Sequence, residues 1–126
     1  MTILYDNRAI AGDGESTVVS ASLLRLDDGP ALVIRDSYCA GRNNPYWDED
    51  DDTVYLDLSV SETARYADKL GVPVDDLLNE IAKRHSVAGA VDAVRKECEA
   101  FGIITNRSVV EPLDDLFGNA GTGGIQ

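Results

Sequence analysis

The stretch that decides the fold is TVVSASLLRL-DDGP-ALVIRDSY, residues 17–38. Residues 17–26 and 31–38 are rich in Val, Ile and Leu, and they flank the four residues 27–30, which combine the turn formers Asp, Gly and Pro. Apolar runs of this length on both sides of a turn predict a β-hairpin. A hairpin is marginal by itself, so further elements are expected to cover its apolar face.

Other segments predict strands that extend this hairpin into a sheet. Residues 3–5, ILY, form a short apolar run near the start of the chain. Residues 53–59 alternate, because the even-numbered positions are Val, Leu and Leu, which is the pattern of a half-buried strand. Residues 103–105 and 109–110 predict two further short strands.

A helix is expected directly after the alternating strand. Ser59 and Glu62 have the spacing of a capping box, so the helix should begin near residues 59–61. It should end near Leu70, because Gly71 suits the left-handed position that follows a helix.

Two more helices are expected before residue 102. Pro73 suits the first turn of the second helix, whose apolar face is Leu77, Leu78, Ile81 and Ala82. Ser86 is expected to cap the third helix, and Gly102 to end it. The buried stripe of this third helix is expected to be Val87, Val91, Val94, Cys98 and Phe101.

This order, with strands first and helices after them, predicts an α+β fold: an antiparallel sheet of three to five strands with about three helices packed on one face. Residues 1–117 are expected to form a single domain. Residues 118–126 carry four glycines and are expected to be a flexible tail, and residues 112–117 are expected to form one helical turn before it.

The chain is strongly acidic, with 23 Asp and Glu against 11 Lys and Arg and a formal net charge of −12. This charge disfavours direct binding to nucleic acid or to an anionic membrane surface. An excess of Asp and Arg is also typical of a GC-rich or salt-adapted source, so the total alone does not decide a function. The distribution is more informative, because residues 48–52 form an unbroken run of five acids and acidic pairs occur at 27–28, 75–76 and 114–115.

The acidic run lies in a segment, residues 40–52, that is expected to be a long loop. An extended chain rises about 3.3 Å per residue, close to the roughly 3.4 Å spacing of phosphates along one DNA strand. Tyr46 and Trp47 stand directly before the run. Aromatic anchors beside a negative field are what an inhibitor of a nucleic-acid-binding protein needs.

Catalytic and metal-binding signatures are weak. The single histidine, His85, follows Lys83 and Arg84 at the expected end of a helix, where a cationic group complements the helix dipole. Cys98 falls on the apolar stripe, and Cys39 is the more exposed candidate for reactivity. The acidic run lacks the Gly and Glu that an EF-hand loop requires. We therefore expect no enzyme activity, no metal and no cofactor, although a small enzyme that uses Cys39 or His85 remains an alternative.

Residues 53–85 resemble the ribbon-helix-helix family of dimeric DNA-binding regulators, with an alternating strand followed by two helices. The resemblance implies that paired strands of a dimer enter the major groove and that Thr53, Tyr55 and Asp57 face the bases. The sequence departs from the family where DNA is contacted, since Asp57 and the two acids at the start of the second helix would repel phosphate.

Residues 113–117, LDDLF, resemble the short motif by which bacterial proteins dock on the replication sliding clamp. Asp115, Leu116 and Phe117 match the acidic-Leu-Phe end of that motif, and Leu113 replaces its expected Gln. The alternative interpretation is a helical turn that packs its Leu and Phe side chains on the core.

These observations favour a cytoplasmic, non-enzymatic binding protein or inhibitor that occupies a basic, nucleic-acid-binding site on a partner protein. A nucleic-acid mimic of the phage anti-defence or toxin-immunity kind, encoded by a phage or mobile element, is its sharpest form. A dimeric ribbon-helix-helix regulator is the alternative, and the oligomeric state stays open. The residues expected to contact the partner are Tyr46, Trp47, Asp48, Glu49, Asp50, Asp51, Asp52, Asp75 and Asp76.

Overall fold

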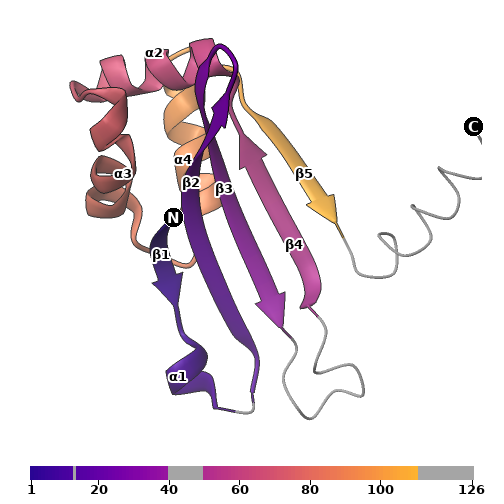
Figure 1. The fold of residues 1–126 in the computed structure, drawn as a ribbon. Coiled ribbons are helices and arrows are strands. Elements are labelled where there is room, and N and C mark those ends of the chain that lie inside the picture. Colours follow the sequence, from indigo (N-terminus) through magenta and orange to yellow (C-terminus); the bar gives the residue numbers. More distant parts are fainter. Residues whose placement is uncertain (13, 40–49, 111–126) are drawn as a thin grey trace, which may run out of the picture.

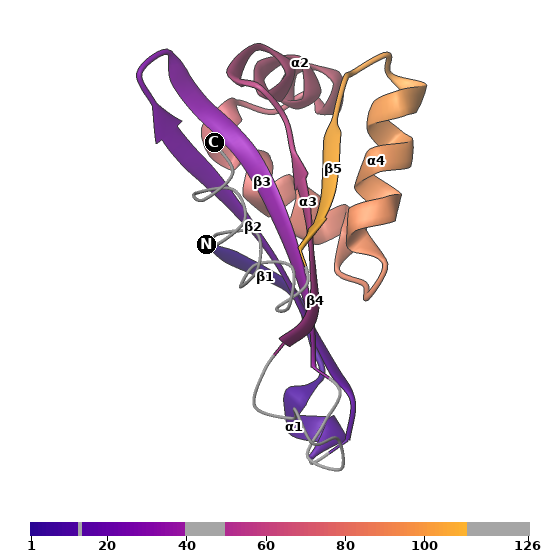
Figure 2. The ribbon, with the colours of Figure 1, turned by 90° about the vertical axis from the view of Figure 1, so that its right-hand side faces the viewer.

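A computed structural model describes residues 1–12, 14–39 and 50–110. These residues form one antiparallel sheet of five strands, and the order of the strands in space follows their order along the chain. Helices pack on one face of the sheet, and no described helix covers the other face (Figure 1, Figure 2). The α+β class expected from the sequence is therefore confirmed. The strands are β1 (Thr2–Asp6), β2 (Ser16–Leu26), β3 (Gly29–Cys39), β4 (Asp50–Asp57) and β5 (Asn106–Val110).

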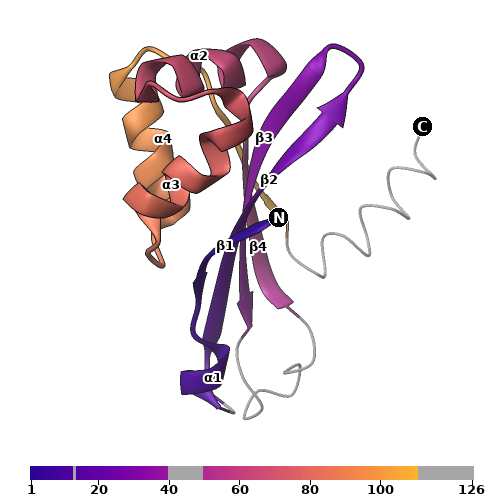
Figure 3. The same cartoon turned by 60° about the vertical axis from the view of Figure 1, so that its left-hand side comes forward.

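Most of the helical structure lies between β4 and β5. The helices there are α2 (Val60–Leu70), the 3-10 helix η1 (Val74–Asp76), α3 (Leu77–His85) and α4 (Ala90–Ala100). One further helix, α1 (Arg8–Ala11), connects β1 to β2. Seen from the side, α2, α3 and α4 gather on one face of the sheet, while the β2–β3 hairpin projects beyond them (Figure 3).

The core lies between the sheet and these helices. Ala21, Ile34 and Leu56 are register partners across β2, β3 and β4, and all three are fully buried. Tyr66 of α2 and Val94 of α4 are fully buried against the same cluster. Burial of one large apolar side chain contributes about 1.5–3 kcal/mol, so Ile34, Leu56 and Tyr66 each stabilise the packing of the helices on the sheet.

The predicted hairpin is present, and its turn requires glycine. Residues 27 and 28 form the turn between β2 and β3, with Leu26 opposite Gly29. Gly29 has a φ of +136°, and a Cβ atom placed there would lie 2.9 Å from Cγ1 of Val60. Both the backbone conformation and the approach of α2 therefore disfavour a larger residue.

Helix α2 begins and ends where the sequence predicts. The Ser59 hydroxyl accepts a hydrogen bond from the Glu62 backbone N–H at 3.2 Å, and Gly71 adopts the left-handed conformation with a φ of +75°. The Glu62 carboxylate accepts from the N–H of Ile104 at 2.5 Å and from Arg65 at 2.7 Å. Glu62 thereby ties the start of α2 to the chain that leads into β5.

The expected boundaries of the next two helices were wrong. Pro73 precedes η1, and α3 begins only at Leu77. Ser86 does not cap α4, because its hydroxyl donates to the carbonyl of Ala82 and so closes α3. Because α4 begins at Ala90, Val87 lies outside the helix and is exposed. The rest of the predicted stripe is confirmed by the burial of Val91, Val94 and Cys98 and the partial burial of Phe101.

Two differences concern the strands. Residues 103–105 are not a strand, and β5 forms from residue 106 onward as one continuous partner of β4. β4 begins at Asp50, so the end of the expected loop 40–52 belongs to the sheet. Residues 40–49 and 111–126 lie outside the described residues, together with the expected helical turn, the clamp-like motif and the tail.

Candidate partner-binding surfaces

The helical half of the molecule pairs many of its own charges. Arg65 contacts Glu62 at 2.7 Å, and Arg84 contacts Glu80 at 2.9 Å. Further ion pairs of 3.3–4.0 Å join Arg84 to Glu97, Lys83 to Glu80, Arg95 to Asp92 and Glu99, and Arg107 to Asp92. Exposed pairs contribute little stability, about 0–1 kcal/mol each, but they reduce the net field around the helices.

The negative charge is concentrated elsewhere in the chain. Residue 13 and residues 40–52 and 111–126 together contain nine of the 23 acids and one of the 11 basic residues. These segments therefore carry −8 of the net charge of −12, and the remainder of the chain carries −4. The acidic character of the protein comes mainly from these segments.

The acidic run enters the sheet at the start of β4. Asp50, Asp51 and Asp52 are the first residues of that strand, where Asp50 pairs with Cys39 and Asp52 with Tyr38. The register shifts between these two pairs, so β4 holds one extra residue there, as in a β-bulge. The last three residues of the acidic run thus belong to β4 and not to the loop expected over residues 40–52. The other four expected contact residues of this segment, Tyr46, Trp47, Asp48 and Glu49, lie outside the described residues.

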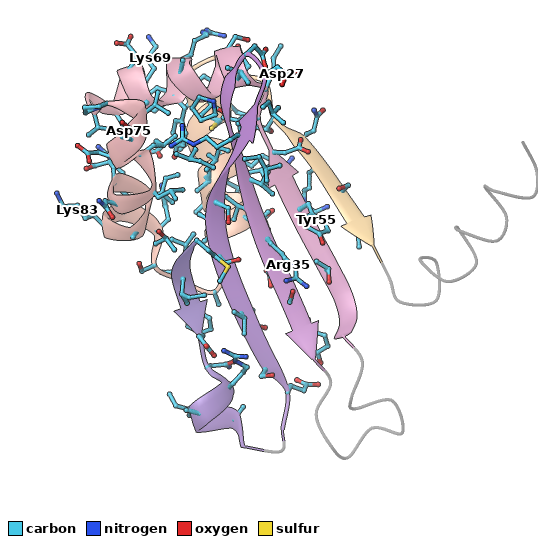
Figure 4. The ribbon with its side chains drawn as sticks, in the orientation of Figure 1. Asp27, Arg35, Tyr55, Lys69, Asp75 and Lys83 are labelled. Atoms are coloured by element: carbon cyan, nitrogen blue, oxygen red, sulfur yellow. The ribbon has the colours of Figure 1, made fainter. Side chains whose placement is uncertain are left out.

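The second acidic pair lies at the opposite end of the sheet. Asp75 and Asp76 are exposed residues of η1, and Asp75 contacts Arg25 at 3.8 Å. Figure 4 shows Asp75 at the same end of the molecule as Asp27 of the hairpin turn. Asp50 is in register, through Cys39, with Ser16, nine residues before Arg25 on β2, which corresponds to roughly 30 Å along a strand. The structure thus separates Asp75 and Asp76 from the acidic run and brings them near the acidic turn of the hairpin.

A partly buried, hydrogen-bonded cluster joins α2, α3 and α4 around Glu97. Its carboxylate accepts from the Tyr66 hydroxyl at 2.6 Å, contacts Nε2 of His85 at 2.9 Å and accepts from Arg84 at 3.3 Å. Burial opposes the charge of Glu97, but the hydrogen bonds from Tyr66 and His85 outweigh it and lower the pKa of the carboxyl. Burial, followed by the hydrogen bond to Glu97, raises the pKa of Tyr66. His85 therefore has a structural partner, which the sequence could not identify because the three residues come from three helices.

Of the two cysteines, only the side chain of Cys98 is described by the structure, and its thiol is poorly reactive. Cys98 is fully buried in the core, and burial, followed by the charges of Glu97 and Glu62, raises the pKa of its thiol to about 12. A thiol with this pKa stays protonated near neutral pH and is a poor nucleophile. The side chain of Cys39 lies outside the described residues.

One carboxylate pair was not singled out by the sequence. Asp36 of β3 is half-buried on the helix-facing side of the sheet, and burial, together with the charge of Asp92, raises its pKa. Asp92 lies at the start of α4 and is 3.9 Å from Nε of Arg107. The two acids thus differ in environment, as the two carboxyls of a general acid–base pair must. In the described residues, no third His, Cys, Asp or Glu side chain joins them to form a metal site.

Residues 53–57, which the ribbon-helix-helix resemblance would pair with a second subunit, have no free edge. β4 pairs with β3 on one side, and residues 53–57 pair with β5 on the other. In the ribbon-helix-helix arrangement this strand pairs with its copy in the second subunit, which requires an open edge. The strand-helix-helix order of residues 53–85 is therefore present, but the edge that the resemblance needs is occupied within the chain.

Comparison with protein-family models, with curated proteins and with solved structures finds no match to this chain. Over residues 1–12, 14–39 and 50–110, no helix is both long and apolar enough to cross a membrane. In the same ranges, no three side chains of the His, Cys, Asp or Glu type gather closely enough to hold a metal ion.

Proposed function

We propose that this protein is a non-enzymatic inhibitor or binding protein whose acidic run occupies a basic, nucleic-acid-binding site on a partner protein. The run, residues 48–52, acts as a mimic of a nucleic-acid backbone, and Tyr46 and Trp47 act as its anchors. Proteins of this kind include phage inhibitors of host defence nucleases and immunity proteins of nuclease toxins.

The observation that carries this proposal is the separation of charge along the sheet. Carboxylates on the helices take part in ion pairs within the fold, whereas an unbroken run of five acids begins before β4 and continues into its first three residues. The strand backbone at 50–52 supports the mimicry, because extended residues repeat about every 3.3 Å and phosphates on one strand about every 3.4 Å. In a regular strand successive side chains alternate between faces, so each face carries half of this density, and the bulge at residues 50–52 interrupts that alternation.

A clustered field of this kind acts mainly on association. Charged groups around an interface steer encounter and raise the association rate, while buried aromatic side chains contribute most of the affinity. The partner is therefore expected to present a positively charged groove with a pocket large enough for an aromatic ring.

The test is affinity capture with tagged protein from a lysate of the source cells, after nuclease treatment. The proposal predicts recovery of a nucleic-acid-binding protein that a double-stranded DNA or RNA oligonucleotide then displaces. Recovery of DNA alone, lost after nuclease treatment, would instead point to a DNA-binding regulator and would contradict the proposal.

Two matched variants locate the interaction. One removes three charges from the acidic run, Asp50→Asn, Asp51→Asn and Asp52→Asn. The other removes three charges from exposed helix positions, Asp68→Asn, Asp92→Asn and Glu99→Gln. Capture should fall by about tenfold for the first variant and change little for the second. Equal loss in both would show that only total charge matters, and it would refute a localised site.

A further inference from the structure

Half of strand β2 has an open edge. β1 spans five residues against eleven in β2, and it pairs only with residues 18–21. Among the strands of the described residues, none pairs with the outer side of residues 22–26. Unpaired N–H and C=O groups along a strand are a template on which another strand can add.

The hydrogen bonds of β3 identify which backbone groups face this edge. The Leu32 N–H donates to Oγ1 of Thr63 at 2.9 Å, and the Leu32 carbonyl accepts from the N–H of Leu58 at 3.0 Å. Both groups of Leu32 therefore point away from β2. Leu23 is the register partner of Leu32, so in an antiparallel pair its own N–H and C=O point away from β3, as do those of Arg25 two residues later. Outside the sheet ladder, no backbone hydrogen bond from the described residues reaches Leu23 or Arg25.

The two faces beside this edge have different chemistry. Ala21 and Leu23 pack toward the core, so Arg25 lies on the same side, where it reaches Asp75. Leu24 and Leu26 lie on the opposite face, and each is 52% exposed. An open edge with two exposed leucines is unusual, because natural edges are normally protected by charge, proline or short length.

Several acidic residues lie at the same end of the molecule as this edge. Asp75 and Asp76 of η1 and Asp27 and Asp28 of the turn are exposed, and Arg25 lies among them. Figure 4 shows Asp27 and Asp75 at this end of the molecule. Of the described residues at this end, only Asp75 is paired with Arg25, so the four carboxylates together leave a negative field that complements a cationic partner.

We propose that residues 22–26 of β2 bind an extended segment of a partner protein in which apolar and basic residues alternate. The segment adds as a sixth strand and bonds to the outward groups of Leu23 and Arg25. Because side chains of a strand alternate between faces, its apolar residues lie beside Leu24 and Leu26 while its basic residues face Asp75 and Asp76.

This site is independent of the proposed function. It lies roughly 30 Å along the sheet from the start of β4, and it depends on backbone pairing rather than on mimicry of nucleic acid. Failure of one test therefore leaves the other intact.

The experiment is an NMR titration of the whole protein with the blocked peptide Val-Lys-Val-Arg-Val-Lys-Val. The amide signals of Leu23 and Arg25 should shift and become protected from hydrogen exchange. Two control peptides separate the contributions. One has the same composition with the residues in blocks, and the other is N-methylated at alternate residues on the pairing edge, and both should bind at least about tenfold more weakly.

Variants test the two faces separately. Leu24→Lys should lower the affinity for the alternating peptide by about tenfold. The double variant Asp75→Asn, Asp76→Asn should lower it by about threefold. Asp68→Asn, an exposed charge on α2, is the matched control and should leave the affinity unchanged.

Three results would overturn the inference. The first is equal binding of the block peptide, and the second is a shift confined to amides near β4. The third is protection of Leu23 and Arg25 that grows with protein concentration before any peptide is added, because a second copy of the chain would then occupy the edge.

Discussion

The two ends of the sheet hold their charges in different ways. At the end covered by helices, Glu97 accepts from Tyr66 and contacts His85, which lie on two other helices. Glu62 accepts from Arg65 on its own helix and from the backbone N–H of Ile104 ahead of β5. At the end where β4 begins, acidic residues follow one another without an interposed base from 48 to 52. The carboxylates of this protein therefore differ in role. Those of Glu62 and Glu97 stabilise the fold, and we propose that those of residues 48–52 attract a partner.

The largest expected effect on stability comes from a substitution in the core between the sheet and the helices. Leu56→Ala should lower the free energy of unfolding by about 2–5 kcal/mol, because Leu56 is fully buried and its loss leaves a cavity. Val109→Ala, on the exposed part of β5, is the control and should cost less than about 1 kcal/mol. Urea unfolding measures both, and equal losses would contradict the described distribution of the core.

A second substitution tests how closely α2 approaches the hairpin. Gly29→Ala should cost about 1–3 kcal/mol, since it adds strain at a positive φ and a contact with Val60. Gly71→Ala also has a positive φ but meets no atom within 4 Å, so it should cost about 1 kcal/mol. Thermal unfolding that ranks the two variants in the reverse order would show that α2 does not pack on the turn as described.

The hydrogen bonds of Glu97 make the free energy of unfolding depend on pH. Because its folded pKa is lowered, Glu97 stabilises the fold at neutral pH, and this contribution is lost as the pH falls below the ordinary value of 4.5 toward the folded pKa. Tyr66→Phe removes one donor, so it should cost about 1–2 kcal/mol at neutral pH and less at about pH 3. Tyr55→Phe on β4 is the control, and a cost for Tyr66→Phe that does not change with pH would contradict this linkage.

The smallest expected effect on stability concerns Asp36, because its ionised form destabilises the folded state. Its folded pKa is raised, so its ionisation is unfavourable above that pKa and the penalty disappears as the pH falls through it. Asp36→Asn should therefore raise stability at neutral pH by a few tenths to about 1 kcal/mol, because solvent screens a half-buried group. At about pH 3 the difference from the parent protein should vanish, and a destabilised variant at neutral pH would contradict the assigned environment.

The sheet was predictable where one local pattern was sufficient. Residues 17–38 combine two apolar runs with a turn, and residues 53–59 alternate, so β2, β3 and β4 follow from the sequence. The short helix α1 was missed, because Arg8–Ala11 is a single turn with no buried residue. The start of α4 was misplaced, because Ser86 has the chemistry of a cap but its hydroxyl bonds backward to Ala82.

The candidate surfaces were only partly predictable. The acidic run is a property of consecutive residues and can be read directly, and so can the pair Asp75–Asp76. The distance between these two acidic groups cannot be predicted from the sequence, because it depends on the register that aligns Asp50 with Ser16 at the start of β2. The open edge at residues 22–26 was also hidden, since it arises from the difference in length between β1 and β2.

In the proposed function, charge at the start of β4 drives recognition of a basic partner. The most direct measurement is the dissociation constant of the captured partner against salt concentration, for the parent protein and for the Asp50→Asn, Asp51→Asn, Asp52→Asn variant. The affinity of the parent protein should fall steeply with salt, and the variant should show both weaker binding and a flatter slope. An affinity that is indifferent to salt, or a variant with the slope of the parent, would contradict the proposed function.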